Sequence, residues 1–262
     1  MKRRITALLL LVLLAACGHK EPKSAFDPNR QSDAALYQLG QQYMEKKDYS
    51  KARDAFKVVF ENFPKSDNRI LAKIGYADAY YKEGGDANFL LAISEYQDFI
   101  SLFPFSPKAE YAQTMIGMCY YRMMEKPDRD QTNTKKAVDE FRKVVDNYPN
   151  GQYYKEAYGK LVECYGRLAE HDYLIARYYD RTGKYQAAVE RVKALLKQYP
   201  ESVHSAAQYY TLAHSLEQLE QFSESCTYYG TLLTKWPNSE QAKDAKEHQT
   251  KVCGDTHQTA KS

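Results

Sequence analysis

The sequence predicts an all-α solenoid of about five stacked helix–turn–helix units, and three observations support this fold class. An aromatic-proline pair recurs five times along the 262 residues. The apolar residues before each pair fall at helical spacings. Most proline and glycine residues lie between the periodic segments, where helices end. The five pairs are Phe63-Pro64, Phe103-Pro104, Tyr148-Pro149, Tyr199-Pro200 and Trp236-Pro237.

The N-terminus has the composition of an export signal. Lys2, Arg3 and Arg4 precede an apolar run of about ten residues, which is too short to cross a bilayer of about 30 Å as a helix. The run ends in Leu-Ala-Ala-Cys17, which resembles the bacterial lipobox; a plain secretory signal with an incidental cysteine is the alternative. We therefore expect a signal peptide over residues 1–16, lipidation of Cys17 and a flexible tether over 17–32. Gly18 follows the cysteine where an inner-membrane retention signal has Asp, so the resemblance implies the periplasmic face of the outer membrane.

Charge argues against a nucleic-acid partner. Removal of Lys2, Arg3 and Arg4 takes three of the 37 bases and leaves as many bases as the 34 acids. No basic stripe interleaved with aromatic residues is present either. The mean hydropathy of −0.69 excludes a polytopic membrane protein.

The repeat has a defined internal pattern. A small residue lies twelve positions before each proline, and a large one lies eight positions before it. In the first unit, Leu36, Gly40, Tyr43, Ala52 and Phe56 fall at positions 4, 8, 11, 20 and 24 of a 34-residue frame, which is similar to the tetratricopeptide (TPR) pattern. The small residues allow close approach of the paired helices, and the large residues fill the gaps between pairs.

The frame gives the boundaries of the solenoid. Units are expected at about 33–66, 70–107, 109–151, 169–202 and 206–239, followed by a closing helix at 240–252 and a disordered tail at 253–262. An extra helical segment, about 153–168, precedes the fourth unit. It either ends there or continues as one helix to about Arg181.

Signals for catalysis are missing from the sequence. It contains no GxSxG, Walker A, GxGxxG or HExxH motif, and its six histidines are dispersed. We expect no enzyme activity, no metal site and no cofactor. Cys119 and Cys164 are expected to be buried helix residues. Cys226 and Cys253 either form a disulfide across the last helix pair or stay free.

The concave surface of the solenoid is the expected binding site. Tyrosine occurs 24 times against 10 phenylalanines, and we expect one part of these rings to form the core and another to line the groove. Carried over from TPR proteins, the groove-lining residues are Tyr37, Gln41, Met44, Asp78, Tyr81, Lys82, Met118, Tyr121 and Arg122. Such a groove suits an extended peptide with aromatic side chains and a terminal carboxylate. Alternatively, Tyr81 and Tyr121 only pack between helix pairs.

Four segments resemble the TPR-repeat outer-membrane lipoprotein family of the β-barrel assembly machinery. They are Phe103-Pro104-Phe105-Ser106-Pro107, Asp128-Arg129-Asp130-Gln131, Tyr148–Tyr153, and the stretch from Arg167 to Gly183 that includes Tyr178-Tyr179-Asp180-Arg181. The first unit departs from the family pattern, because Phe63-Pro64-Lys65-Ser66 lacks the second proline.

The resemblance implies a scaffold without catalysis. Its N-terminal units would receive the C-terminal segments of unfolded outer-membrane proteins. Its C-terminal units would dock the BamA barrel through a periplasmic POTRA domain, next to other assembly lipoproteins. The docking residues implied are Asp128, Arg129, Asp130, Gln131, Arg177, Tyr178 and Arg181. The alternative is a periplasmic TPR adaptor for cell-wall enzymes or envelope-division proteins.

Overall fold

The protein forms an elongated stack of helices in the computed structural model, which describes residues 31–200 and 204–259. Cys17, the expected signal peptide and most of the expected tether lie outside the described residues. The described part contains eleven α-helices and no strand, which confirms the all-α fold class. None of these helices is both long enough and apolar enough to span a membrane.

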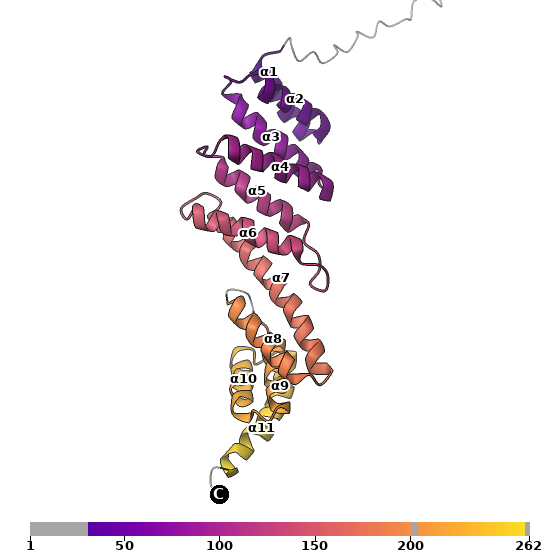
Figure 1. Cartoon of the computed structure of the whole chain (residues 1–262), viewed down its shortest axis with the longest axis vertical. Helices are drawn as coiled ribbons and strands as arrows, with labels where there is room; N and C mark the ends of the chain where they lie inside the picture. Colours follow the sequence, from indigo (N-terminus) through magenta and orange to yellow (C-terminus); the bar gives the residue numbers. More distant parts are fainter. Residues whose placement is uncertain (1–30, 201–203, 260–262) are drawn as a thin grey trace, which may run out of the picture.

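Ten of the helices form five antiparallel hairpins along the long axis of the molecule (Figure 1). They are α1 (Asp33–Glu45) with α2 (Tyr49–Asn62), α3 (Asn68–Glu83) with α4 (Asp86–Leu102), α5 (Ala109–Arg122) with α6 (Thr132–Asn147), α7 (Tyr154–Arg181) with α8 (Tyr185–Gln198), and α9 (Ala206–Gln218) with α10 (Phe222–Lys235). The last helix is α11 (Glu240–Thr259). Each helix packs on its neighbours in sequence, as expected for a TPR-type solenoid.

The helices end where the repeat pattern predicts. The backbone N–H of the aromatic residue before each repeat proline donates to the carbonyl four residues earlier, and the proline then stops the helix. At helix starts, the Ser32 and Asp48 side chains accept from backbone N–H groups three residues on. Ser205 and Gln208 form a complete capping box at α9.

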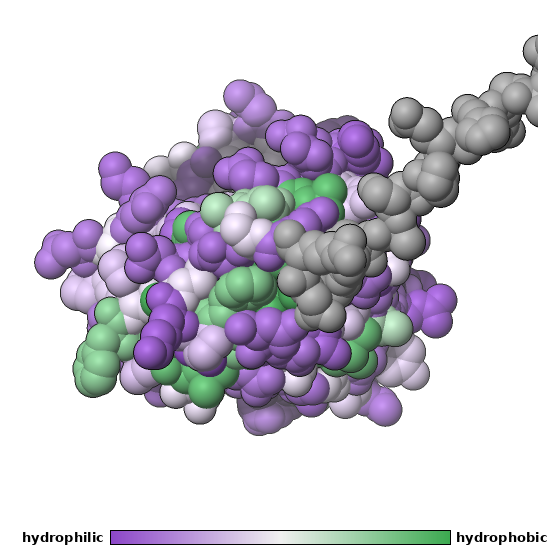
Figure 2. All heavy atoms as spheres, turned by 90° about the horizontal axis from the view of Figure 1, so that it is seen from above, coloured by the Kyte–Doolittle hydropathy of each residue, from purple (hydrophilic) through white to green (hydrophobic). Residues whose placement is uncertain are grey.

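Small and large residues interlock between hairpins as the frame requires. The buried ring of Phe56 lies between Gly40 and Gly75, and a Cβ atom at Gly40 would stand 2.5 Å from that ring. Phe141 packs on Gly117 in the same way, where a Cβ atom would stand 2.7 Å from the ring. The core consists of four apolar clusters that follow one another along the stack. Seen from the N-terminal end, hydrophilic side chains cover most of the surface (Figure 2).

The extra segment and the first helix of the fourth unit form one helix of 28 residues, α7. This settles the alternative that the sequence left open. The first half of α7 packs against α6 through Leu161 and Cys164, and its second half packs against α8 through Tyr173 and Ala176. A single apolar cluster runs along both halves, so α7 joins the first three hairpins to the last two.

The C-terminal end differs from the expected boundary. Helix α11 continues to Thr259, whereas we expected the helix to stop at Val252 and a disordered tail to begin at Cys253. Cys226 on α10 and Cys253 on α11 form a disulfide with a Cα–Cα separation of 5.9 Å. The disulfide fixes α11 to α10 at the residue where we expected the tail to begin. Cys119 and Cys164 are free and buried, and burial raises the pKa of each thiol to about 12.

Loss of the disulfide is expected to destabilise the C-terminal helices. The link closes a 27-residue separation, and a loop of that size contributes about 3 kcal/mol through restriction of the unfolded chain. The Cys226→Ser/Cys253→Ser protein should therefore have a lower free energy of unfolding in urea, followed by circular dichroism. Reductant should lower the stability of the wild type and leave the double variant unchanged. Equal unfolding curves for wild type and variant would contradict the expectation.

Candidate functional site

The expected groove residues lie on the first helices of the first three hairpins. On α1, the Tyr37 ring is 5.7 Å from the Phe56 ring, and Gln41 Nε2 donates to the Tyr37 hydroxyl at 3.0 Å. Tyr37, Gln41 and Met44 are all partly exposed. The α1 side chains therefore reach the surface while their inner edges contact the core.

On α3, Lys82 is exposed, Tyr81 and Asp78 are partly exposed, and Asp78 also has partners on neighbouring helices. The Asp78 carboxylate accepts hydrogen bonds from the hydroxyls of Tyr96 and Tyr111, the latter at 2.8 Å. Burial raises the pKa of Asp78, and the two tyrosine hydrogen bonds act against this effect. The carboxylate thus joins α3 to α4 and α5, while Asp78 remains partly exposed, and its place in the groove stays a prediction.

On α5, Tyr121 and its neighbours form a polar cluster with α7. The Tyr121 hydroxyl donates to Glu163, and Lys160 Nζ lies 4.4 Å from the centre of the Tyr121 ring. Lys160 also forms an ion pair with Glu163 at 2.9 Å, and this hydrogen bond raises the pKa of the lysine. Met118 and Tyr121 are partly buried against the apolar cluster of α7. Tyr121 therefore both packs on the core and remains partly exposed at the surface.

Tyr81 lies near two cations, Arg122 and Lys160, and one acid, Glu156. Its ring packs 5.7 Å from Phe89, and burial raises the pKa of its hydroxyl. Arg122 and Lys160 are close enough for their charges to act against that rise, whereas Glu156 adds to it. Arg122 is exposed, and its guanidinium lies 6.0 Å from the centre of the Phe89 ring. Two aromatic rings and two cations from three hairpins therefore meet here.

Sequence reasoning missed Lys160 and Glu163. Both residues lie in the extra segment, which has no position in the TPR frame. The helical spacing of Lys160 and Glu163 indicates only that they share a face of α7. The crossing of α7 next to α5, which brings that face to Tyr121, depends on tertiary packing.

The expected docking loop between α5 and α6 is held by α7. His171 Nδ1 lies 2.7 Å from the Pro127 carbonyl, and Arg167 donates to the Glu125 carbonyl at 3.1 Å. Asp128, Arg129 and Asp130 are exposed. A hollow of about 490 Å³ opens beside them, lined by Glu125, Lys126, Arg129 and Asp130.

Gln131 differs from its three neighbours. It is buried, its amide donates to the carbonyls of Lys126 and Arg129, and its Oε1 accepts from Thr134. These hydrogen bonds hold the loop between α5 and α6 together from its buried side. The prediction that Gln131 belongs to a docking surface therefore needs correction, because its polar atoms are already used.

The end of α7 is fixed by the next hairpin. Asp180 accepts from Ser215 Oγ at 2.7 Å and pairs with His214 Nδ1 at 2.8 Å, and this hydrogen bond raises the pKa of His214. Arg177 and Arg181, both exposed, line a hollow of about 500 Å³ between α7, α9 and α11. Tyr178 is exposed too, but it lies on the face of α7 that also bears His171, seven residues earlier. The three expected docking residues on α7 thus occupy two adjacent faces of the helix, and the other four lie in the loop between α5 and α6.

A known protein family covers most of these elements. The model of the YfiO family, described as an outer membrane lipoprotein, matches residues 29–221, which include all of the groove and docking residues above. The chain belongs to this family. The match also includes α7, the element that a generic TPR array lacks.

Curated relatives of this family member carry a common name. The chain is similar to outer membrane protein assembly factor BamD from Caulobacter vibrioides, with 29% identity over 77% of this chain and 65% of the relative. It is 26% identical to BamD from Rickettsia prowazekii over 90% of this chain and 92% of the relative. BamD from Neisseria gonorrhoeae is 24% identical over 91% of this chain and 93% of the relative. The chain therefore spans less than two thirds of the Caulobacter protein but nearly the whole of the other two.

Solved structures show weaker likeness. The TPR2AB domain of yeast Sti1 in complex with pHSP90 is 19% identical, with a TM-score of 0.44 over 83% of each chain. The thermophilic TPR protein TTC0263 from Thermus thermophilus is 15% identical, with a TM-score of 0.34 over 85% of this chain and 99% of the other.

Proposed function

We propose that the chain is a periplasmic scaffold lipoprotein of the outer-membrane β-barrel assembly machinery. The observation that supports this most is the match to relatives named outer membrane protein assembly factor over nine tenths of their length. Lipidated Cys17 anchors the scaffold to the outer membrane. The solenoid binds two partners and carries out no reaction.

The groove receives the C-terminal segments of unfolded outer-membrane proteins. Tyr81 and Tyr121 supply flat apolar rings with polar tips, and such rings bind aromatic side chains of an extended peptide. Arg122 and Lys160 supply donors that suit a terminal carboxylate. Tyr37, Gln41, Met44, Lys82 and Met118 extend the same surface.

Removal of both tyrosine rings tests this assignment. In the Tyr81→Ala/Tyr121→Ala protein, affinity for barrel-derived C-terminal peptides should fall about tenfold, because each ring contributes roughly 0.5–1.5 kcal/mol of aromatic contact. Fluorescence anisotropy of a labelled peptide measures the change, and the helical circular dichroism spectrum should persist. Equal peptide affinity in wild type and variant would refute the groove assignment.

The second partner binds at α7. The loop residues Asp128, Arg129 and Asp130 with Arg177, Tyr178 and Arg181 form a charged surface fit for a POTRA domain of a BamA-type barrel. Asp180 keeps the end of α7 in place by its bonds to α9, so Arg181 stays exposed and oriented. Other assembly lipoproteins join the same complex.

Charge reversal at Arg181 is expected to weaken this complex. The Arg181→Glu side chain would repel the acidic groups that pair with the arginine, and loss of one such pair costs about 2–5 kcal/mol when the pair is buried by the partner. Co-purification of the BamA-type barrel with the tagged chain should therefore drop at least tenfold. The exposed Lys197→Glu change on α8 is the control and should leave recovery intact. Unchanged recovery with Arg181→Glu would count against docking at this surface.

A further inference from the structure

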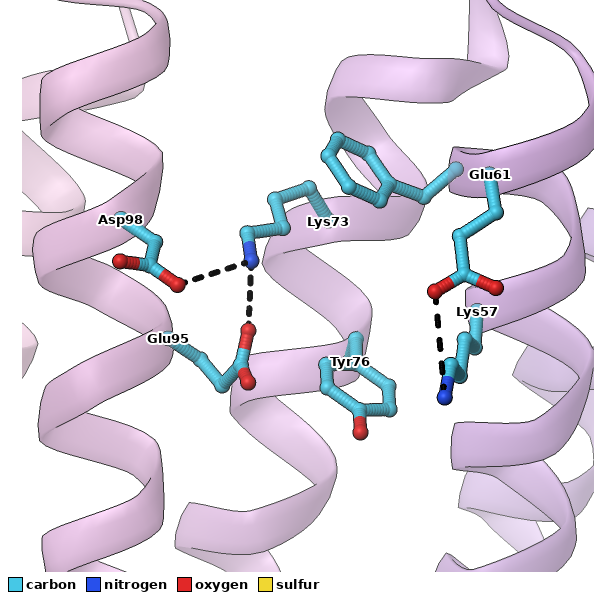
Figure 3. A pocket seen from close by; sticks show the side chains of 7 residues that line it. Lys57, Glu61, Lys73, Tyr76, Glu95 and Asp98 are labelled. Carbon is cyan, nitrogen blue, oxygen red and sulfur yellow. Dashed lines mark hydrogen bonds and ion pairs between the residues drawn. The ribbon is translucent and has the colours of Figure 1, made fainter.

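A pocket on α2, α3 and α4 lies outside the proposed groove and docking surfaces. Its volume is about 190 Å³, and its lining is Lys57, Phe60, Glu61, Lys73, Tyr76, Glu95 and Asp98. This is less than the 300–1,000 Å³ of a typical small-molecule site, so a single side chain is the size that fits. Figure 3 shows Asp98 and Glu95 on one wall, Glu61 and Lys57 on the other, and Lys73 and Tyr76 between them.

The buried lysine in this pocket is already neutralised. Lys73 is 7% exposed, and its Nζ is 2.5 Å from Glu95 and 3.7 Å from Asp98. Its charge also lies 5.0 Å from the centre of the Phe60 ring. Glu95 therefore forms the closer ion pair with Lys73, and Asp98 interacts with the lysine only through the longer contact.

Two carboxylates remain available at the mouth of the pocket. Asp98 and Glu61 are both more than half exposed, and the Glu61 contact to Lys57 is 3.8 Å. Exposed pairs of this kind contribute about 0–1 kcal/mol, so an incoming cation replaces them at little cost. The lining residues carry two bases and three acids, and a third base, Arg69, lies 4.8 Å from the Phe60 ring.

Exposed leucines stand on both sides of the acids. Leu91 and Leu102 are 47% and 53% exposed, and they share one face of α4 with Glu95 and Asp98. Eleven residues of helix place them about 16 Å apart. Along this face of α4, the two acidic residues therefore lie between two exposed leucines.

The next hairpin has the same geometry without these features. Gln113 replaces Lys73 and donates to Glu140 at 2.6 Å, as Lys73 does to Glu95. Counted back from the repeat prolines, Lys143 replaces Asp98, Ser101 replaces Glu61, and the polar Lys136 and Asn147 replace the two leucines. The acidic residues of the pocket and the two exposed leucines are thus not needed to form the repeat fold.

We propose that this pocket binds an arginine side chain of a partner protein, in a segment that has an apolar residue on each side of the arginine. The guanidinium stacks on the aromatic ring of Tyr76 and pairs with Asp98 and Glu61, because the Phe60 ring already contacts Arg69 and Lys73. Arginine fits better than lysine because its planar group can stack and bond at once. Apolar residues on either side of the arginine contact Leu91 and Leu102. This surface is separate from the proposed peptide groove and from the α7 docking surface.

The test uses a fluorescein-labelled hexapeptide, Leu-Ser-Arg-Ser-Ser-Leu, with an amidated C-terminus. Amidation removes the carboxylate that the groove would bind. Anisotropy is measured on the full mature chain, on Glu61→Gln/Asp98→Asn, and on the matched control Asp139→Asn/Asp146→Asn, which removes two exposed acids of α6. A second peptide with citrulline in place of arginine keeps the shape and removes the charge.

Binding of the arginine peptide should weaken about tenfold in the pocket variant and stay unchanged in the control. Citrulline should weaken binding to the wild type by a similar factor and have little further effect on the pocket variant, because the two changes remove the same interaction. The melting temperatures should agree within error, since Lys73 and Glu95 are retained. Absence of binding to the wild type, or equal affinity of the arginine and citrulline peptides, would overturn the proposal.

Discussion

Replacement of Phe141 with alanine is expected to lower the free energy of unfolding by about 3–5 kcal/mol. The Phe141 ring is fully buried, packs directly on Gly117 and belongs to the apolar cluster that runs along α7. Alanine would leave a cavity between α5, α6 and α7 that glycine cannot fill, so the loss includes both transfer and cavity contributions. Because each hairpin contacts only its neighbours, the loss interrupts the stack at its middle.

Phe105 provides the control for this prediction. It is 98% exposed in the turn between α4 and α5, so Phe105→Ala should change stability by less than about 0.5 kcal/mol. Urea unfolding followed by circular dichroism at 222 nm measures both variants. A loss below about 1 kcal/mol for Phe141→Ala would show that the large position of the repeat does not hold the hairpins together.

Reversal of the two groove cations is expected to have the largest effect on binding. In the Arg122→Glu/Lys160→Glu protein, peptides with a free C-terminal carboxylate should bind roughly 30- to 100-fold more weakly, because two attractions become repulsions. Lys160 contacts both Tyr121 and Glu163, and Arg122 lies near Phe89, the ring that packs on Tyr81, so the reversal acts beside both groove tyrosines. The effect should decrease at high salt.

The amidated form of the same peptide separates charge from packing. It should bind wild type and variant with nearly equal affinity, since it lacks the group that the cations pair with. Lys135→Glu/Lys197→Glu changes the net charge equally at exposed positions of α6 and α8 and should leave affinity unaltered. An equal loss for free and amidated peptides would mean that the cations do not bind the carboxylate.

The fold was largely predictable because local and repeat signals agree. Five aromatic-proline pairs define helix ends, and the small and large positions define which faces meet. Two features depend on tertiary structure instead. The sequence allowed α7 to be one helix or two, and packing on both α6 and α8 makes it one. The end of α11 could not be predicted, because the sequence near Cys253 has little apolar periodicity. In the structure the helix continues to Thr259, and Cys253 is linked to Cys226 on α10.

The site was predictable only at the level of helix faces. The TPR frame placed Tyr81, Tyr121 and Arg122 on surface positions, as the structure has them. The same frame cannot tell whether a polar side chain on that face finds an internal partner. Asp78 finds two tyrosine hydroxyls on neighbouring helices, and Gln131 bonds to carbonyls of its own loop. Lys160 was missed for another reason, because it lies in the extra segment, which has no position in the frame.

Affinity purification from detergent-solubilised envelopes tests the scaffold proposal most directly. The tagged full chain, anchored through Cys17, is recovered after mild cross-linking, and its partners are quantified by mass spectrometry against an Arg181→Glu sample. The proposal predicts that a BamA-type barrel with POTRA domains is the most enriched partner of the wild type and is depleted in the variant. Enrichment of cell-wall hydrolases or division proteins without any barrel would contradict it and favour a periplasmic adaptor instead.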